Sequence, residues 1–96
     1  MKTVNESTVF PKVVTILCSV SPTLPPEQIN KDTLLIADLN IDSLKVAELS
    51  VMLEEAFNVP VFVPELLTRV DDPYHLNVAS LVELVQQKLT AHAGNG

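Results

Sequence analysis

Residues 42–57 constrain the fold of this chain more than any other segment, because their apolar residues recur at helical spacing. At about 100° per residue, four apolar side chains form one narrow stripe: Val46, Leu49, Leu53 and Phe57. Asp42 or Ser43 is expected to begin the helix, since both are good N-cap residues, and Asn58 can adopt the left-handed turn that ends it. The pattern predicts a helix over residues 42–57 with one face in an apolar core.

Three other segments also show helical signals. The first runs from about Thr8 to Cys18 or Ser19, with Pro11 in the first turn, where its missing N–H costs nothing. A short helix is expected from Pro64 to Arg69, and Asn77 is expected to cap a last helix. Apolar positions in the first and last helices follow one face: Phe10, Val13, Val14, Leu17, Val78, Leu81, Val82, Val85 and Leu89. The sequence therefore predicts an all-α chain of three longer helices and one short helix.

The connections and the ends are expected to be irregular. Prolines 22, 25 and 26 mark a long loop between the first two helices, and five apolar residues are expected to anchor that crossing: Leu24, Ile29, Leu35, Ile36 and Leu39. Residues 60–64, bounded by two prolines, are expected to form an extended linker, and residues 70–75 a loop. Residues 1–7 and 91–96 lack an apolar period and are expected to be flexible tails, which leaves one domain at 8–90.

The charge and composition exclude several classes of function. Twelve acidic against six basic residues give a net charge of −6, which disfavours nucleic acid and anionic membrane surfaces and favours partners with basic patches. Cys18 is the single cysteine, and no segment has the length of a signal peptide core or a membrane span, so we expect a cytoplasmic monomer. Both glycines lie at positions 94 and 96, so no glycine-rich nucleotide loop is expected.

Ser43 is the strongest candidate for a functional side chain. The run Asp38-Leu39-Asn40-Ile41-Asp42-Ser43-Leu44 places an acidic pair and a serine at the mouth of the predicted helix. Free N–H groups and the helix dipole stabilise an anion such as a phosphate ester at this position. The structural alternative is that Ser43 is only the N-cap. Ser43 therefore suits permanent attachment of a phosphorylated group, with simple capping as the competing interpretation.

Catalytic and metal sites have weaker support. A hydrolase would need Ser43, His75 and Asp38 or Asp42 to converge in a cleft that excludes water, and nothing in the sequence places His75 near Ser43. His75 and His92 are far apart, and Asp71-Asp72 lacks the alternating ligands and the central glycine of a calcium loop. We expect neither a metal site nor a catalytic group.

A second apolar stripe lies roughly opposite the first on the predicted helix at 42–57. It consists of Leu44, Ala47 and Val51, bordered by Glu48, Glu54 and Glu55. Folding does not require such a stripe on a solvent-exposed helix face. Scattered surface apolar residues, or cover by a neighbouring element, would also account for it. The stripe is a candidate surface for binding a partner.

The run from Asp38 to Leu44, followed by Glu48-Leu49, Leu53-Glu54-Glu55 and Phe57, resembles the acyl carrier protein family. The resemblance extends from about Phe10 to Leu89 and implies a four-helix bundle. It implies 4′-phosphopantetheine on Ser43, added by a phosphopantetheinyl transferase that recognises Asp42. Acyl groups would be held on this arm as thioesters for acyl-transferring, condensing and other enzymes of a fatty-acid, polyketide or related pathway, and the carrier would catalyse nothing. Leu44, Ala47, Glu48, Val51, Glu54 and Glu55 would form the docking face.

Several positions depart from the family pattern. Asn40 stands where the family usually has glycine, although Asn can reach the same backbone region. Ala37 stands where a second acidic residue is common, and Lys45 stands where many members carry an acidic or neutral residue. The Val70–Leu76 segment is longer than usual. These departures favour a specialised pathway carrier. A peptidyl or aminoacyl carrier, or an unmodified helical adaptor that binds through Leu44, Ala47 and Val51, remains an alternative.

Overall fold

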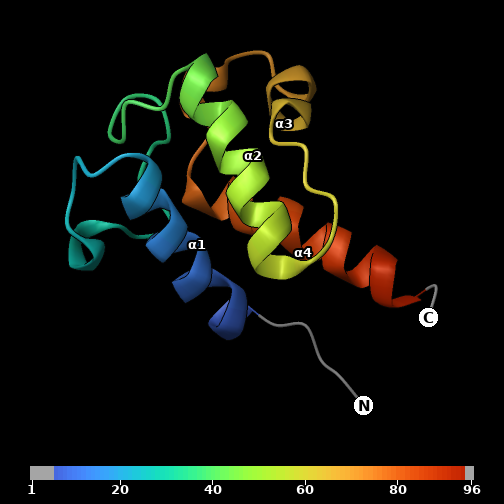
Figure 1. Ribbon diagram of the computed structural model, residues 1–96. Coiled ribbons are helices and arrows are strands. Elements are labelled where there is room, and N and C mark those ends of the chain that lie inside the picture. Colours follow the sequence, from blue (N-terminus) through green and yellow to red (C-terminus); the bar gives the residue numbers. More distant parts are fainter. Residues whose placement is uncertain (1–5, 95–96) are drawn as a thin grey trace.

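The computed structural model describes residues 6–94, with side chains described for residues 8–91, and within this range the chain is all helical (Figure 1). The elements in chain order are α1 (Glu6–Val20), the 3₁₀ turn η1 (Pro26–Gln28), α2 (Ser43–Phe57), α3 (Pro64–Arg69), the 3₁₀ turn η2 (Pro73–His75) and α4 (Val78–Gly94). The prediction of three longer helices, one short helix and no sheet is confirmed for the described residues.

The first helix begins earlier than the sequence analysis predicts. It starts at Glu6 rather than Thr8, so Pro11 lies inside the helix and not in its first turn. Val9 is buried and continues the apolar face of Val13 and Leu17 by one more turn, so core packing extends the helix beyond the proline.

The last helix ends later than predicted. It continues through residues 91–94, with no proline to stop it. α1 and α4 thus extend into the segments 1–7 and 91–96 that were expected to be tails. The flexibility of these segments stays a prediction. Residues 1–5 and 95–96 lie outside the described range.

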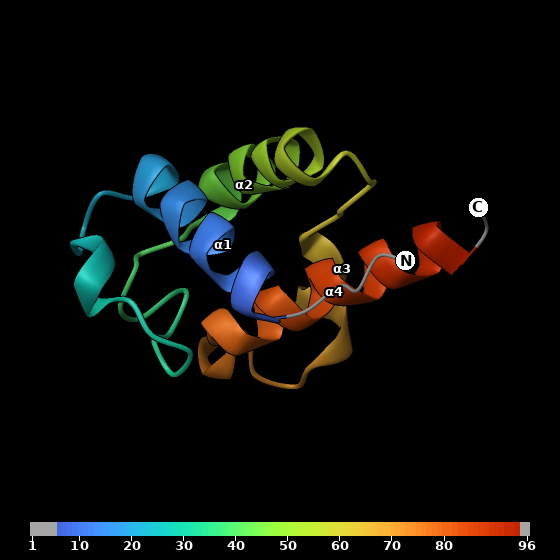
Figure 2. The same ribbon diagram turned by 90° about the horizontal axis from the view of Figure 1, so that it is seen from below.

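The core is aliphatic and lies where three long helices meet. α1 packs against both α2 and α4, as Figures 1 and 2 show from two directions. The predicted α2 stripe is confirmed: Val46, Leu49 and Leu53 are buried and Phe57 is half-buried, with Lys12 of α1 lying 5.5 Å from the centre of its ring. Every predicted core position of α1 and α4 is buried except Phe10 and Leu89, which are half-buried.

The long α1–α2 connection is fixed to α4. Ile29, Leu35 and Leu39 are buried as predicted, while Leu24 and Ile36 are half-buried. An isolated antiparallel bridge pairs Leu34 with Asn77, and the Val78 N–H donates to the Thr33 carbonyl at 2.9 Å. Asn77 caps α4 as predicted, because its Oδ1 accepts from the Ser80 N–H at 3.0 Å. This anchoring fixes the position at which the chain enters α2.

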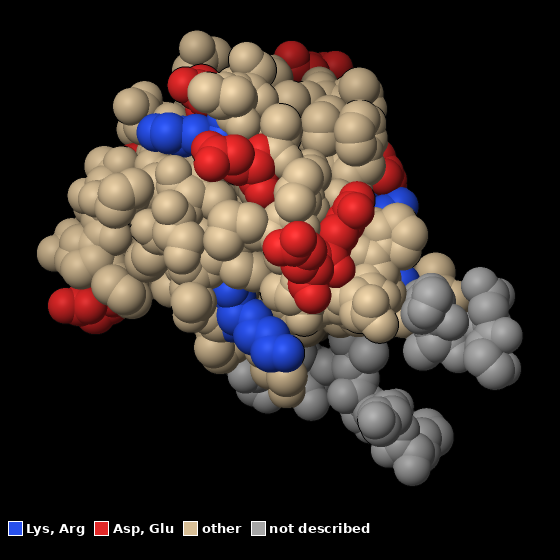
Figure 3. Space-filling view, viewed as in Figure 1, with Lys and Arg blue, Asp and Glu red and all other residues tan. Residues whose placement is uncertain are grey.

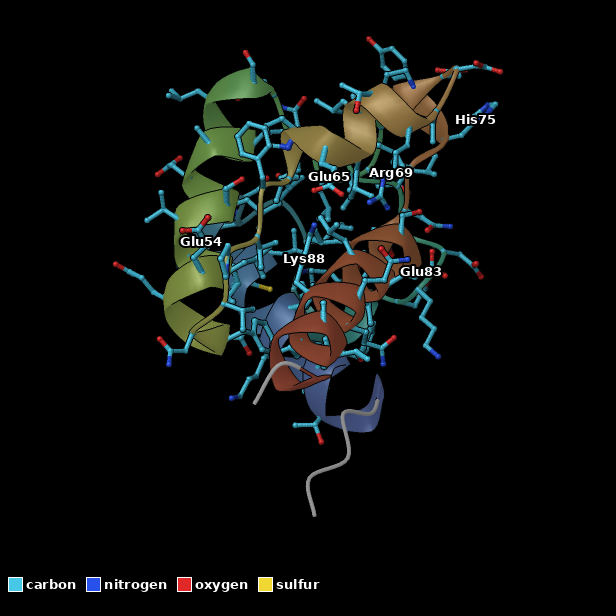
Figure 4. All side chains as sticks on the ribbon, turned by 90° about the vertical axis from the view of Figure 1, so that its right-hand side faces the viewer. Glu54, Glu65, Arg69, His75, Glu83 and Lys88 are labelled. Atoms are coloured by element: carbon cyan, nitrogen blue, oxygen red, sulfur yellow. The ribbon has the colours of Figure 1, made fainter. Side chains whose placement is uncertain are left out.

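The short helix α3 lies near the end of the molecule at which α2 begins (Figures 1 and 4). The extended linker before it is attached to α2, because the Val63 N–H donates to Ser50 Oγ at 3.0 Å and the Val61 N–H donates to Glu54 Oε2 at 3.3 Å. Figure 4 shows Glu65 of α3 facing Lys88 of α4, and their ion pair measures 3.0 Å. α3 is thus held from both sides.

Candidate functional site

The start of α2 is built around Asp42. Its backbone is extended, with φ −101° and ψ −176°, and its Oδ1 accepts a hydrogen bond from the Lys45 N–H at 2.9 Å. This is the geometry of an N-cap. Of the two predicted cap residues, Asp42 is therefore the cap and Ser43 is the first residue of the helix.

Ser43 has no capping role. Its side chain is exposed, and its hydroxyl has no hydrogen-bond partner among the described residues. The N–H groups of the first helical residues have no intrahelical acceptor, and Asp42 occupies only that of Lys45. The interpretation of Ser43 as a plain N-cap is therefore wrong. The Ser43 side chain is an accessible hydroxyl beside unpaired backbone donors.

The loop before α2 explains how Ser43 comes to be presented. Asn40 adopts the left-handed conformation with φ 58°, as expected for an Asn at this position. Asp38 Oδ2 accepts from the Leu34 N–H at 2.9 Å, which closes the preceding turn. Leu39 is fully buried, and its carbonyl accepts from the buried Ser21 hydroxyl. Buried residues and hydrogen bonds thus hold the backbone immediately ahead of the serine.

A hollow of about 300 Å³ adjoins Ser43. Residues of the α1–α2 loop, α2, α3 and the segment around η2 line it, and most of them are apolar. Sequence reasoning did not find this hollow, because Leu66, Leu67 and Tyr74 carry no motif and come close to α2 only through the tertiary fold. The unusual length of residues 70–76 was the single signal available.

The second apolar stripe of α2 is exposed. Leu44 is 72% and Val51 56% exposed, and the remaining members of the predicted docking face, Ala47, Glu48, Glu54 and Glu55, are exposed as well. In Figure 3, acidic side chains lie along α2 among uncharged residues. Glu54 additionally holds the linker through the Val61 N–H. No described neighbour covers this face, so cover by another element is not the explanation for the stripe.

The residues of the alternative hydrolase do not converge. Ser43 lines the hollow just described, whereas His75 lines a different one, and its Nε2 lies 3.5 Å from Asp72 Oδ2. Within the part of the chain that the structure describes, no group of three His, Cys, Asp or Glu side chains is placed to hold a metal ion. The side chain of His92 lies outside the described residues.

A helical bundle that presents an unengaged serine at a helix mouth has the arrangement expected of a carrier domain, and comparison with known proteins shows the family. The family described as the phosphopantetheine attachment site matches residues 11–72, which is more than half of the chain. An acyl carrier protein from Guillardia theta is 34% identical over 89 residues, which span 91% of this chain and 99% of that protein. The chain belongs to the acyl carrier protein family, and its cofactor is 4′-phosphopantetheine.

None of the described helices is long and apolar enough to cross a membrane.

Proposed function

We propose that this chain carries acyl groups on a 4′-phosphopantetheine arm joined to the Ser43 hydroxyl through a phosphodiester. The observation that carries the proposal is the exposed, unengaged hydroxyl of Ser43 at the first position of α2. The neighbouring backbone N–H groups stabilise a phosphodiester anion there. When attached, the arm supplies a terminal thiol that holds an acyl group as a thioester.

The side chains around Ser43 fit such an attachment. Asp42 fixes the helix start through its 2.9 Å hydrogen bond while its second carboxylate oxygen accepts none from the described residues. That oxygen is available to a phosphopantetheinyl transferase, for which Asp42 is the proposed recognition residue.

We assign partner docking to Leu44, Ala47, Glu48, Val51, Glu54 and Glu55. Exposed apolar side chains flanked by carboxylates complement a partner surface that has an apolar centre and a basic rim. The partners are the transferase and acyl-transferring, condensing and related enzymes of a fatty-acid, polyketide or similar pathway. The chain acts as a cytoplasmic monomer without catalytic activity of its own.

The apolar hollow beside Ser43 favours acyl cargo over the peptidyl or aminoacyl alternative. Its buried lining is aliphatic, including Leu49, Val63 and Leu66. A charged amino group would lose hydration among these buried side chains, none of which offers it a hydrogen-bond partner.

Loading by a transferase tests the attachment. The protein is incubated with coenzyme A and a broad-specificity phosphopantetheinyl transferase and then weighed intact. We expect a gain of one arm, and none for Ser43→Ala. An unchanged mass of the wild-type protein would favour the unmodified adaptor.

A charge-reversal pair tests the docking face. Glu48→Lys should raise the KM of the transferase for the carrier, because it places a cation opposite the basic residues proposed for the transferase surface. Glu83→Lys is the matched control, since Glu83 is also exposed but lies on α4, away from α2 (Figure 4). An equal effect of both variants would mean that only net charge matters and would refute a defined face on α2.

A further inference from the structure

Tyr74 combines two properties that the proposed function leaves unused. It is the single tyrosine in a chain without tryptophan, and 61% of its surface is exposed. It nevertheless lines the same hollow as Ser43. An exposed aromatic residue beside the candidate attachment point requires an explanation.

The lining of the hollow divides into a buried floor and an exposed rim. The floor is aliphatic: Leu35, Ile41, Val46, Leu49, Val63, Leu66 and Leu76. The exposed lining residues are Asn40, Asp42, Ser43 and Tyr74. Three of these four are small and polar, so Tyr74 is the large aromatic residue among them, and the half-buried Ile36 and Leu67 complete the lining. An acyl chain held at the thiol end of an arm on Ser43, once inside the hollow, gains cover at the rim from this ring.

The backbone of Tyr74 is held while its ring stays accessible. Its N–H donates to Asp72 Oδ1 at 3.0 Å, and Pro73 fixes the preceding φ. The buried Leu76 follows, with its carbonyl accepting from the Leu35 N–H at 3.0 Å. Leu35 and Leu76 both belong to the floor. The turn is therefore tied to the floor of the hollow through the Leu35–Leu76 hydrogen bond.

We propose that Tyr74 is a positioning residue whose ring packs against the acyl group carried through Ser43 and retains that group in the hollow. The inference rests on the proposed function. The physical basis is burial of apolar area, since a tyrosine ring offers a large apolar face. A hollow of about 300 Å³ equals the share of roughly ten water molecules, which is ample for an eight-carbon chain. An acetyl group is too short to pack against the Tyr74 ring.

The fluorescence of the single tyrosine reports directly on this contact. The protein is loaded by the transferase from coenzyme A, acetyl-coenzyme A or octanoyl-coenzyme A, and quenching of tyrosine emission by acrylamide is measured in each form. We expect the octanoyl form to show about half the quenching constant of the form with the bare arm, and the acetyl form to match the bare arm. Equal quenching in all three forms would overturn the proposal.

Moving the tyrosine by one residue provides the control. The double variant Tyr74→Phe with His75→Tyr again has one tyrosine, now at a position that does not line the hollow. Its quenching should not depend on the acyl group. A dependence equal to that of the wild type would mean that the signal reports a general change in the turn, which also overturns the proposal.

Retention of the acyl group gives a second readout. Intact mass spectrometry over time measures the spontaneous hydrolytic loss of the octanoyl group from the wild type and from the Tyr74→Ala and Tyr74→Phe variants. Tyr74→Ala should lose it roughly fivefold faster, about 1 kcal/mol at 1.4 kcal/mol per tenfold, and Tyr74→Phe should match wild type because the ring is kept. Identical rates in all three would contradict the role of the ring. If the same mass spectra show no arm on the wild type, the proposed function itself fails, and this inference fails with it.

Discussion

Replacing Asp42 by alanine should destabilise the protein, whereas replacing Ser43 should not. The Asp42 carboxylate accepts from the Lys45 N–H at 2.9 Å, whereas the Ser43 hydroxyl has no partner among the described residues. Loss of an N-cap costs about 1 kcal/mol, which lowers the Tm of a domain of this size by roughly 4–8 °C. Ser43→Ala removes no bond and adds the best helix former, so its effect should stay within about 0.5 kcal/mol.

Urea unfolding followed by circular dichroism measures both changes. Asp42→Ala should lower the midpoint by roughly 0.3–1 M, given an m-value of about 1–3 kcal/mol/M. Asp42→Asn separates capping from the proposed recognition of Asp42 by the transferase, because asparagine caps a helix as well as aspartate does but lacks the charge. It should unfold like the wild type and yet accept the arm more slowly. A Ser43→Ala variant as unstable as Asp42→Ala would refute the assignment of the cap.

Three further predictions concern the packing and the charges. Leu53→Ala should cost roughly 2–5 kcal/mol by urea unfolding, because Leu53 is fully buried; a cost below 1 kcal/mol would contradict the described core. Ser50→Ala should cost about 1–3 kcal/mol, since it leaves the Val63 N–H without its 3.0 Å acceptor, and no change would mean that water replaces the hydroxyl. The hydrogen bond from Lys88, together with the charge of Arg69, lowers the pKa of Glu65. The ionised Glu65 carboxylate therefore stabilises the folded protein above the usual glutamate pKa of about 4.3. This stabilisation is lost as the pH falls through the lowered value. Glu65→Gln should therefore reduce the difference in stability between pH 7 and pH 3, and an unchanged difference would refute the role of this carboxylate.

Elements with a strong local signal were predictable from sequence. The α2 stripe, the left-handed Asn58 with φ 58° and the short helix Pro64–Arg69 follow from periodicity, cap preference and proline placement. Asp42 and Ser43 are both good caps, so propensity could not choose between them. The choice depends on where the chain enters the helix, which the long α1–α2 loop and its contacts with α4 determine.

Features that depend on tertiary contacts were not predictable. The Leu34–Asn77 bridge and the hollow join residues far apart in sequence that no periodic pattern relates. The start of α1 was misjudged because the burial of Val9 outweighs the local effect of Pro11. Sequence thus located the serine and the exposed apolar stripe of α2, whereas the surroundings of the serine required the fold.

Mapping the arm to a single residue tests the central claim most directly. Trypsin cleaves after Lys31 and Lys45, and the resulting peptide, residues 32–45, contains Ser43 and no other serine. After loading by the transferase, tandem mass spectrometry should locate the phosphopantetheine mass on this peptide and assign it to Ser43. An arm on any other residue, or a peptide that remains unmodified while the transferase loads a control carrier, would contradict the account.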